Sequence, residues 1–430
     1  MKKKIILSLP YGMSIRDLID EKFLLLLSKQ FEIIIFSSVF ENTKSLSFIK
    51  KFKGISFLPY KKNFFIESIL ISLISNLQTI KYLNKKKILS FSTIREALKN
   101  GNSNKILEND YKKLNSFFLN IICKFNIIYF PIVYVSKIFL FIFSLKYFFL
   151  FFNKNVQFFF TSHPYCNLDY SLEYCAKIFN LKTIAMIHSW DNVTTKLLMH
   201  FKYYKVFVWN KILKNQLISI YKYKSKDIKV IGIPQFDDYH KNENYYSKKY
   251  FLKNTKIKNK KIVTIFCGCP DLTPKYDKIL YEISNLFERK ELKSKFKLIL
   301  RCHPGYDYSW TKKIYNKNTY INIPENLSVP MEVKSLGRYK EEKKFLSSVL
   351  KYSDVIINFF STTTLDAVYF DKPVIGICID GNSDENLPGS QLSYYYQWDH
   401  YKNLMKTKGI DLCKNVEQLP KLIKKAEYLN

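Results

Sequence analysis

The sequence has few glycines and lacks the loops that glycine builds at common nucleotide sites. Only 11 of its 430 residues are glycine, and neither a G-x-G-x-x-G loop nor a Walker A loop is present. Those loops let the backbone approach phosphates closely, so a dinucleotide-binding or P-loop ATPase interpretation has no support. D-x-D is also absent. A bound diphosphate would therefore need arginine, histidine and hydroxyl groups instead of a carboxylate-held metal.

Acidic residues are scarce as well. The chain has 36 Asp and Glu against 69 Lys and Arg, a formal net charge of +33. Such a surplus attracts phosphate-bearing partners, namely nucleic acid, anionic lipid or nucleotide substrates. However, Lys, Asn, Ile, Phe and Tyr are abundant while Gly, Ala and Arg are scarce, which is typical of an AT-rich genome. No RNP-like, zinc-finger or helix-turn-helix signal is present either, so we expect no nucleic-acid partner.

The eight cysteines form no C-x-x-C pair. Nothing demands disulfides, which fits a reducing cytoplasm. Cys267 and Cys269 alternate on a predicted strand, as half of a metal site or, as we expect, as small buried residues. We predict no metal. The opening MKKKIILSLPYG has an apolar core of five residues, shorter than a signal peptide requires, and predicts a first strand.

Residues 116–152 are the most apolar region. Lys124, Lys137 and Lys146 interrupt it, so no stretch reaches the ~18–20 uncharged residues of a spanning helix. Two interpretations are open. The segment could lie in a membrane interface, with the lysine stems reaching toward headgroups, or it could form a pair of buried helices that pack on the N-terminal domain.

Strand-like runs, several of them continuously apolar, alternate with helical stretches. They lie at 4–9, 31–38, 156–162, 182–188, 205–210 and 228–234, and again at 261–268, 295–304, 354–360 and 372–380. This alternation predicts two Rossmann-like α/β domains in series.

A polar, lysine-rich stretch at 235–261 is the best linker candidate. We therefore place an N-terminal domain at 1–240, with an apolar helical insertion near 105–155, and a C-terminal domain at 258–395. The tail 396–430 is predicted to be loop and helix, and could pack back on the N-terminal domain.

Hydroxyl residues cluster where ligands collect in open α/β sheets, at the carboxyl end of a strand. Ser361, Thr362, Thr363 and Thr364 follow the strand at 354–360, and a helix is expected from about Leu365. A helix N-cap needs one hydroxyl. Three or more favour a bound phosphate, which the helix dipole also attracts.

The first turn of the same helix carries a carboxylate. Asp366 could complement the helix dipole or accept hydrogen bonds from ribose hydroxyls.

A second cluster follows the strand at 295–304. Arg301 and His303 project to the same side of that strand, so both could reach one anion. A third lies in the other domain, where His188 and Asp191 follow the strand at 182–188. Either could be a general base, or the two could form a turn packed by Trp190.

Two weaker candidates lie in the N-terminal half. His163 occupies a position similar to that of His188. After the first strand, Gly12 allows close backbone approach and Arg16 adds a charge at the start of a helix.

Taken together, these stretches resemble GT-B type glycosyltransferases, which have two Rossmann-like domains facing across a cleft. The resemblance is strongest to bacterial surface-polysaccharide transferases, including the CDP-glycerol glycerophosphotransferase group. It rests on SDVIINFFSTTTLDAVYFDKPVIGI, RCHP, HSWDNVTTK, VFVWN and IKVIGIPQFDDY. These stretches fall within residues 155–430, whereas 40–155 match nothing in that family.

The resemblance implies roles for the candidate residues. Ser361, Thr362 and Thr363 would hold the donor diphosphate and Asp366 the ribose. His303 and Arg301 would stabilise the leaving phosphate. The residues with a further implied role are Gly268 near the donor and His188 or Asp191 as the acceptor-side base.

The expected protein is thus a metal-independent transferase. It would move a sugar, or less readily a polyol phosphate, from a nucleotide-activated or CDP-glycerol-like donor to a surface glycan or polyprenyl-linked acceptor, as in capsule or lipopolysaccharide synthesis. It would work in the cytoplasm or peripherally on the inner membrane. The alternatives are a non-hydrolysing sugar-nucleotide 2-epimerase and a non-catalytic nucleotide-sugar-binding protein of the same fold.

Overall fold

The structure is a computed structural model that describes residues 2–428 with gaps. Outside the description lie 12–13, 16–17, 19–20, 39–53, 84–116, 153–154, 197, 269–272, 274–275, 304–307, 315, 325–333 and 381–391, and the side chains of 21–22 and 334–340. The chain divides into two compact units, with a boundary between Gln235 and Phe236.

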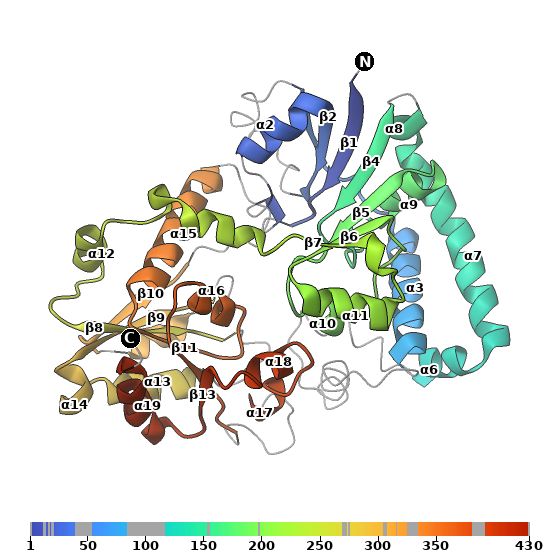
Figure 1. Cartoon of the computed structure of the whole chain (residues 1–430). Helices are drawn as coiled ribbons and strands as arrows, with labels where there is room; N and C mark the ends of the chain where they lie inside the picture. The colour runs from blue at the N-terminus through green and yellow to red at the C-terminus, as the bar shows by residue number, and fades with distance from the viewer. Residues whose placement is uncertain are drawn as a thin grey trace. The chain divides into compact units, whose positions relative to one another are not determined.

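The N-terminal domain is built on a sheet of seven strands (Figure 1), in the spatial order β3-β2-β1-β4-β5-β6-β7. The strands are β1 Lys3–Ser8, β2 Phe31–Phe36, β3 Ile55–Leu58, β4 Val156–Thr161, β5 Lys182–Met186, β6 Lys205–Val208 and β7 Ile228–Val230. Every neighbouring pair is parallel. Ile33, Ile34 and Ile35 are successive and all buried, as expected for a strand covered on both faces.

Helices connect these strands. They are α2 Glu21–Gln30, α3 Phe65–Leu83, α6 Phe117–Lys124, α7 Asn126–Ser144, α8 Phe148–Phe152, α9 Tyr170–Ile178, α10 Asn192–Thr195 and α11 Lys211–Tyr221. Helix α9 packs on the sheet by burying Leu172 against Ile6 and Phe159.

The C-terminal domain has a second, six-stranded parallel sheet, in the order β10-β9-β8-β11-β12-β13. The strands are β8 Lys261–Phe266, β9 Phe296–Arg301, β10 Thr319–Asn322, β11 Val355–Asn358, β12 Val374–Ile377 and β13 Ile410–Cys413. The helices are α12 Lys248–Asn254, α13 Tyr276–Leu286, α14 Lys290–Lys293, α15 Lys334–Tyr352, α16 Thr363–Tyr369, α17 Leu392–Tyr395, α18 Tyr401–Met405 and α19 Leu419–Glu427.

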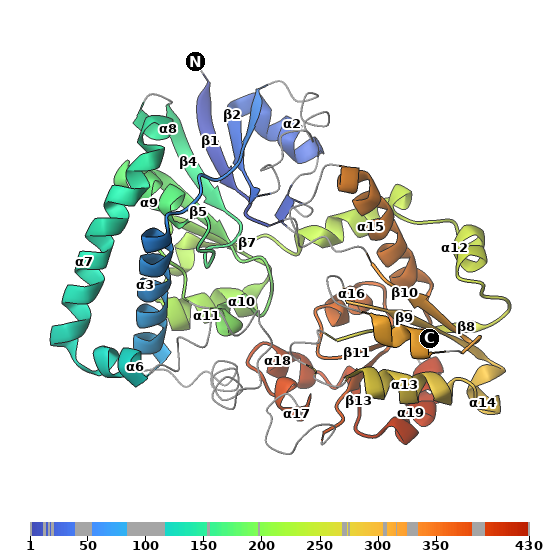
Figure 2. The ribbon, with the colours of Figure 1, turned by 180° about the vertical axis from the view of Figure 1, so that it is seen from behind.

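Helices cover both faces of this second sheet. Helices α13 and α19 lie on one face and α15 and α16 on the other (Figures 1 and 2). All six residues of β9 are buried, Lys297 and Arg301 included, as expected for a strand covered on both faces. The prediction of two Rossmann-like α/β domains is confirmed.

The predicted tail is not a separate unit. Strand β13 pairs with β12 in parallel, and α19 buries Leu419 and Ile423 while contacting β11, β12 and β13. Residues 396–430 therefore complete the C-terminal domain, and the prediction of a separate tail of loop and helix is wrong.

The polar stretch taken for a linker also belongs to the C-terminal domain. The Tyr239 hydroxyl donates to Asp366 Oδ1 at 2.8 Å, and the Tyr246 backbone N–H donates to Ser348 Oγ at 2.9 Å. The C-terminal domain therefore begins at Phe236 rather than 258.

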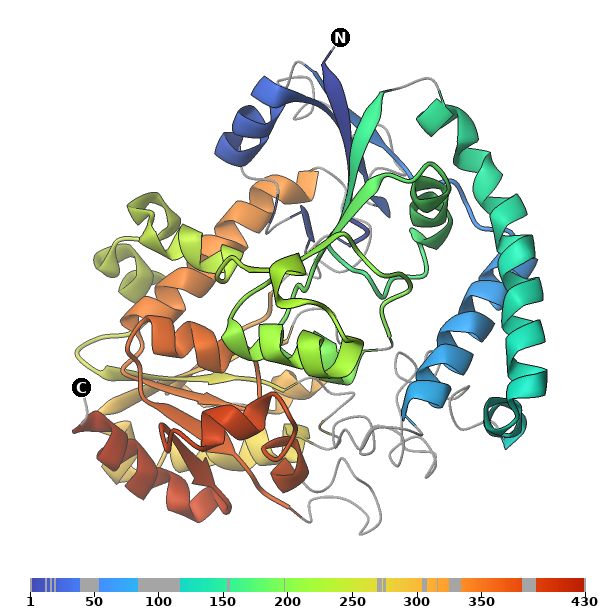
Figure 3. The same ribbon diagram turned by 45° about the vertical axis from the view of Figure 1, so that its right-hand side comes forward.

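The apolar region predicted near 116–152 forms α6, α7, the 3-10 turn η5 Leu145–Tyr147 and α8. In Figures 1 to 3, α7 lies at the outer edge of the N-terminal domain with α3 beside it. Within the described residues, Asn126–Phe152 is long and apolar enough to cross a membrane, judged by length and composition only. It is not a buried pair, because most of its side chains are exposed.

Candidate functional site

The candidate site of the C-terminal domain lies where its sheet changes direction. From β8 the chain continues to β9 and β10 on one side, and from β11 to β12 and β13 on the other, so β8 and β11 flank the topological switch point. Phe266 pairs with both Arg301 and Asn358, and the three strands therefore end level with one another. Ligands of open α/β sheets bind in the crevice outside such a point.

The hydroxyl cluster begins three residues after β11. Thr364 is buried, and its hydroxyl is bonded to Asn358 Nδ2 at 2.9 Å and to the Tyr401 hydroxyl at 2.8 Å. Ser361, Thr362 and Thr363 are only partly buried. The structure thus separates the four hydroxyls into one that holds α16 in place and three that solvent or a ligand can reach.

The backbone just before these hydroxyls is strained. Phe360 has a φ of 31°, a value that is unfavourable for a bulky side chain. Its ring stacks on Tyr395 at 4.0 Å between centroids, and the Tyr396 hydroxyl accepts from its N–H at 3.3 Å. These contacts hold a sharp turn between β11 and α16, and strain of this kind is often found at functional sites.

The arginine–histidine turn lies two strands from the hydroxyl cluster. With neighbouring strands ~4.8 Å apart, β9 and β11 are about 10 Å apart across β8. His303 is two residues beyond the end of β9 and is partly exposed. The two predicted phosphate elements therefore lie at one edge of one sheet, on either side of β8.

Arg301 differs from His303 in its surroundings. Its guanidinium is buried and donates to Asn322 Oδ1 and, over 3.2 Å, to Glu342 Oε2. Burial lowers the pKa of Arg301, and the Glu342 carboxylate opposes that shift. Much of its charge is thus compensated inside the protein, which favours a role in supporting β9 over direct contact with an anion.

Two further predicted residues have packing partners. Asp366 is buried and accepts from the Tyr239 hydroxyl. Gly268 follows β8, where a Cβ would lie 3.1 Å from Phe359 Cβ and 2.8 Å from Thr273 Oγ1. The close approach of Phe359 is therefore sufficient to explain the glycine.

In the N-terminal domain, Asp191 is held in a local turn. It precedes α10 and accepts hydrogen bonds from the Ser189 hydroxyl and, at 2.7 Å, from the Thr195 hydroxyl. His188 lies three residues before it, is 8% exposed, and follows β5.

His163, which was a weaker candidate than His188 in the sequence, is the unexpected neighbour of His188. The two rings lie 4.8 Å apart, and the Tyr11 ring is edge-on to His163 at 4.9 Å. His163 Nδ1 is 2.9 Å from Ser14 Oγ and 3.0 Å from Ser162 Oγ. It follows β4, which neighbours β1 at the switch point of the first sheet.

A buried carboxylate lies at the carboxyl ends of β1 and β4. Asp169 Oδ2 accepts from the Ser8 hydroxyl at 2.6 Å and from the Thr161 hydroxyl at 3.0 Å. Burial raises the pKa of Asp169 to about 6, although both hydrogen bonds oppose the shift. Ser8 and Thr161 are paired across β1 and β4, so this contact ties together the strands at the first switch point.

Gly12, Arg16 and Cys269 lie outside the described residues. Among the described side chains, no group of three or more His, Cys, Asp or Glu is placed to hold a metal ion.

Comparison with known proteins gives matches in structure alone. No protein-family model matches the chain, and no curated protein matches it in sequence. The UDP-GlcNAc 2-epimerase of Methanocaldococcus jannaschii matches over 99% of this chain and 93% of its own, at 12% identity and a TM-score of 0.51.

Two further solved structures match less well. UGT89C1 of Arabidopsis thaliana covers 99% of this chain and 90% of its own, at 8% identity and a TM-score of 0.48. The wall teichoic acid polymerase TagF covers 99% and 80%, at 12% identity and a TM-score of 0.46. The likeness to the epimerase shows the fold and leaves the substrate open. The chain has the α/β architecture of GT-B proteins, with two Rossmann-like domains.

Proposed function

We propose that the protein transfers a sugar, or less readily a polyol phosphate, from a nucleotide-activated donor to a surface glycan or a polyprenyl-linked acceptor. The single observation that carries this proposal is the edge of the second sheet, where Ser361, Thr362, Thr363 and His303 lie on either side of the β8–β11 switch point. The proposal includes a cytoplasmic location, at the inner face of the membrane when the acceptor is lipid-linked.

The donor diphosphate would bind at this edge without a metal. Partly exposed hydroxyls and backbone N–H groups can donate to phosphate oxygens. His303 would donate to the leaving phosphate as charge develops on it, which is where preorganised donors lower the barrier most. Arg301 would act through β9, because Asn322 and Glu342 already engage its guanidinium.

The acceptor hydroxyl would lose its proton to a base of the N-terminal domain. Since two hydroxyls already donate to Asp191, we favour His188. The contact with His163 would fix the orientation of the His188 ring.

A 2-epimerase has the same fold and remains the second candidate. It would convert its nucleotide sugar without an acceptor. We favour transfer over epimerisation because transfer needs few carboxylates at the donor edge. Asp366 is the one carboxylate predicted there, and it already accepts a hydrogen bond from the Tyr239 hydroxyl.

The donor is identified by a thermal-shift screen against UDP-, GDP-, CDP- and CMP-sugars and CDP-glycerol. We expect one nucleotide class to raise the melting temperature through preferential binding to the folded state. The Ser361→Ala/Thr362→Ala variant should bind that donor at least about 100-fold more weakly, as expected for two lost hydrogen bonds to charged groups. The matched control is Ser219→Ala, which removes an exposed hydroxyl of α11.

Product analysis then separates the candidate functions. Release of the nucleotide only when an acceptor is added, at a rate that EDTA leaves unchanged, supports transfer. If the protein instead forms the C2 epimer of the nucleotide sugar without an acceptor, the proposed function is epimerisation and not transfer. Stabilisation by none of the nucleotides would contradict both enzymatic assignments.

A further inference from the structure

Helix α7 is apolar around most of its circumference, with Lys137 as its one charged residue, but only one stripe of it is packed. The buried residues are Tyr129, Val133, Ser136, Leu140 and Ser144, at the three- and four-residue spacing of a single helical face. Elements α3, α6, α9 and η5 contact this helix. A helix that is apolar on all sides belongs in an apolar environment on all sides, and the protein supplies that environment for one stripe only.

The rest of the helix exposes large apolar side chains. We call the following exposed residues the α7 face: Phe117, Phe118, Phe125, Ile127, Phe130, Tyr134, Val135, Ile138, Phe139, Phe141, Ile142, Leu145, Phe149 and Phe152. At 100° per residue, Ile127, Tyr134 and Ile138 lie together, opposite the buried stripe. Their side chains are 83%, 68% and 45% exposed. Single exposed apolar residues are ordinary, but a contiguous set of this size marks an interaction site.

The charged residues of the segment that carries this face have one sign. The 58 residues from Tyr111 to Leu168 contain no Asp or Glu, but they contain six lysines. Among these, Lys124 and Lys137 are exposed on α6 and α7 themselves. Anionic headgroups would meet no carboxylate from this segment, and lysine stems can lie along an apolar surface while their ammonium groups reach toward phosphate.

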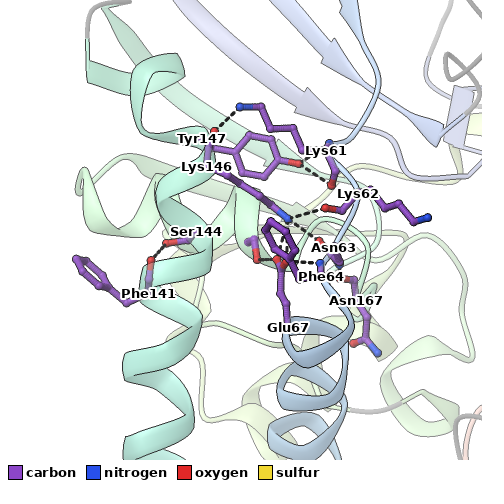
Figure 4. A network of polar contacts seen from close by, with 11 residues as sticks. Lys61, Lys62, Asn63, Phe64, Glu67, Phe141, Ser144, Lys146, Tyr147 and Asn167 are labelled. Atoms are coloured by element: carbon purple, nitrogen blue, oxygen red, sulfur yellow. Dashed lines mark hydrogen bonds and ion pairs between the residues drawn. The ribbon is translucent and has the colours of Figure 1, made fainter.

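Among the described residues, the carboxylate of Glu67, which lies beside η5, is paired inside the protein (Figure 4). Glu67 is fully buried in the first turn of α3, and its two oxygens accept from Lys146 Nζ at 2.9 and 3.0 Å. The backbone N–H of Phe64 also donates to Glu67, at 2.9 Å, as does the Ser171 hydroxyl. One carboxylate thus joins the start of α3 to η5 and to α9.

The same network fixes how α7 is attached to its domain. The Tyr147 hydroxyl accepts from the Lys61 N–H at 2.8 Å, and the rings of Phe64 and Phe143 are 5.7 Å apart. Phe141, in contrast, points away from the network (Figure 4). Because one side of α7 is tied to α3 and the domain behind it, the helix can lie on a bilayer but not cross it as an isolated span.

We propose that the α7 face docks the protein on an anionic lipid surface, with α7 lying along the membrane plane. Its aromatic and aliphatic side chains enter the headgroup region while Lys124 and Lys137 contact lipid phosphates. Charge selects this occupant, because a lysine-bearing, carboxylate-free apolar face complements anionic lipid. The docking goes beyond the transfer reaction and holds whether or not the protein transfers a sugar.

The test is flotation of the full chain with vesicles of phosphatidylcholine alone and of phosphatidylcholine with phosphatidylglycerol. The wild-type protein should float with the anionic vesicles. The Ile127→Ser/Tyr134→Ser/Ile138→Ser variant should bind them at least tenfold more weakly. The matched control, Tyr281→Ser/Ile323→Ser/Tyr428→Ser, removes three apolar side chains that are 46%, 49% and 89% exposed in the C-terminal domain, and should bind as the wild type does.

A second variant tests the lysines. Lys124→Glu/Lys137→Glu should reduce binding to anionic vesicles toward that seen with phosphatidylcholine alone. Absence of vesicle binding by the wild type, or equal binding by the triple serine variant, would overturn the proposal. Sedimentation velocity supplies the rival outcome: a dimer that the serine variant abolishes, without vesicle binding, would assign the face to self-association. The nucleotide thermal shift should persist in every variant, so a failure of docking is separable from a failure of the proposed function.

Discussion

At the scale of single residues, Arg301 and His303 are neighbours in sequence with different surroundings. Arg301 is buried against Glu342 and Asn322, whereas His303 is partly exposed beyond the end of β9. A contribution to stability and a contribution to the reaction should therefore be separable by substituting one residue at a time.

We predict that Arg301→Leu lowers the free energy of unfolding by about 2 kcal/mol, because Glu342 loses its partner in a partly buried position. His303→Ala should leave the melting temperature unchanged and lower kcat about 100- to 1000-fold, the usual loss for one donor to a developing charge. Chemical denaturation and steady-state kinetics of both variants measure the two effects. Near-normal turnover of the His303→Ala enzyme would show that His303 has no role in the mechanism. If Arg301→Leu leaves stability unchanged but weakens donor binding, Arg301 contacts the donor phosphate directly.

At the scale of elements, most of the strands were predicted, but the short strands β3, β10 and β13 were missed, and the contacts between distant segments were not predictable. The apolar run at 354–360 predicted a strand, which the structure shortens to β11 because Phe359 and Phe360 already turn toward α16. The hydroxyl cluster could be found because its position at a strand end is a local property. For α7 the sequence left an exposed and a buried placement open, because apolar periodicity is the same in a covered and an uncovered helix.

Long-range pairing decides the rest of the site. His163 and His188 meet because β4 and β5 are neighbours, and a sequence alone does not give the order of strands. The segment after Gln235 is polar and resembles a linker, yet Tyr239 reaches Asp366 from it. The partner of a buried carboxylate more than a hundred residues away leaves no periodic signal.

The tail offers an element-scale prediction. Ile423 of α19 is fully buried, and α19 contacts β11, β12 and β13. We predict that Ile423→Ala destabilises the C-terminal domain by about 2–5 kcal/mol, the cost of a buried cavity. Amide hydrogen exchange should accelerate in β12 and β13 and stay unchanged in β4 and β5. Lys421→Ala, which truncates an exposed side chain of the same helix, should alter neither, and faster exchange confined to the N-terminal sheet would contradict the assignment of the tail.

At the scale of the whole molecule, the chain carries two sheets, each with its own switch point, and an apolar helix at the edge of the first domain. The proposed donor site uses the second sheet alone, while the proposed lipid surface uses α6, α7 and α8. A molecule organised in this way should bind a soluble nucleotide and a vesicle through separate parts of its sequence.

We therefore predict two distinct footprints in amide hydrogen exchange of the intact chain. A saturating donor nucleotide should slow exchange mainly around 266–268, 301–303 and 358–366, because binding stabilises the locally folded state of those segments. Anionic vesicles should instead slow exchange in 117–152, where contact with lipid excludes water from the α7 face. The Ile127→Ser/Tyr134→Ser/Ile138→Ser variant should lose only the second footprint, and Ser361→Ala/Thr362→Ala only the first. If vesicles slowed amide exchange in the second sheet, or the nucleotide slowed it in α7, the assignment of donor binding and lipid binding to separate segments would be wrong.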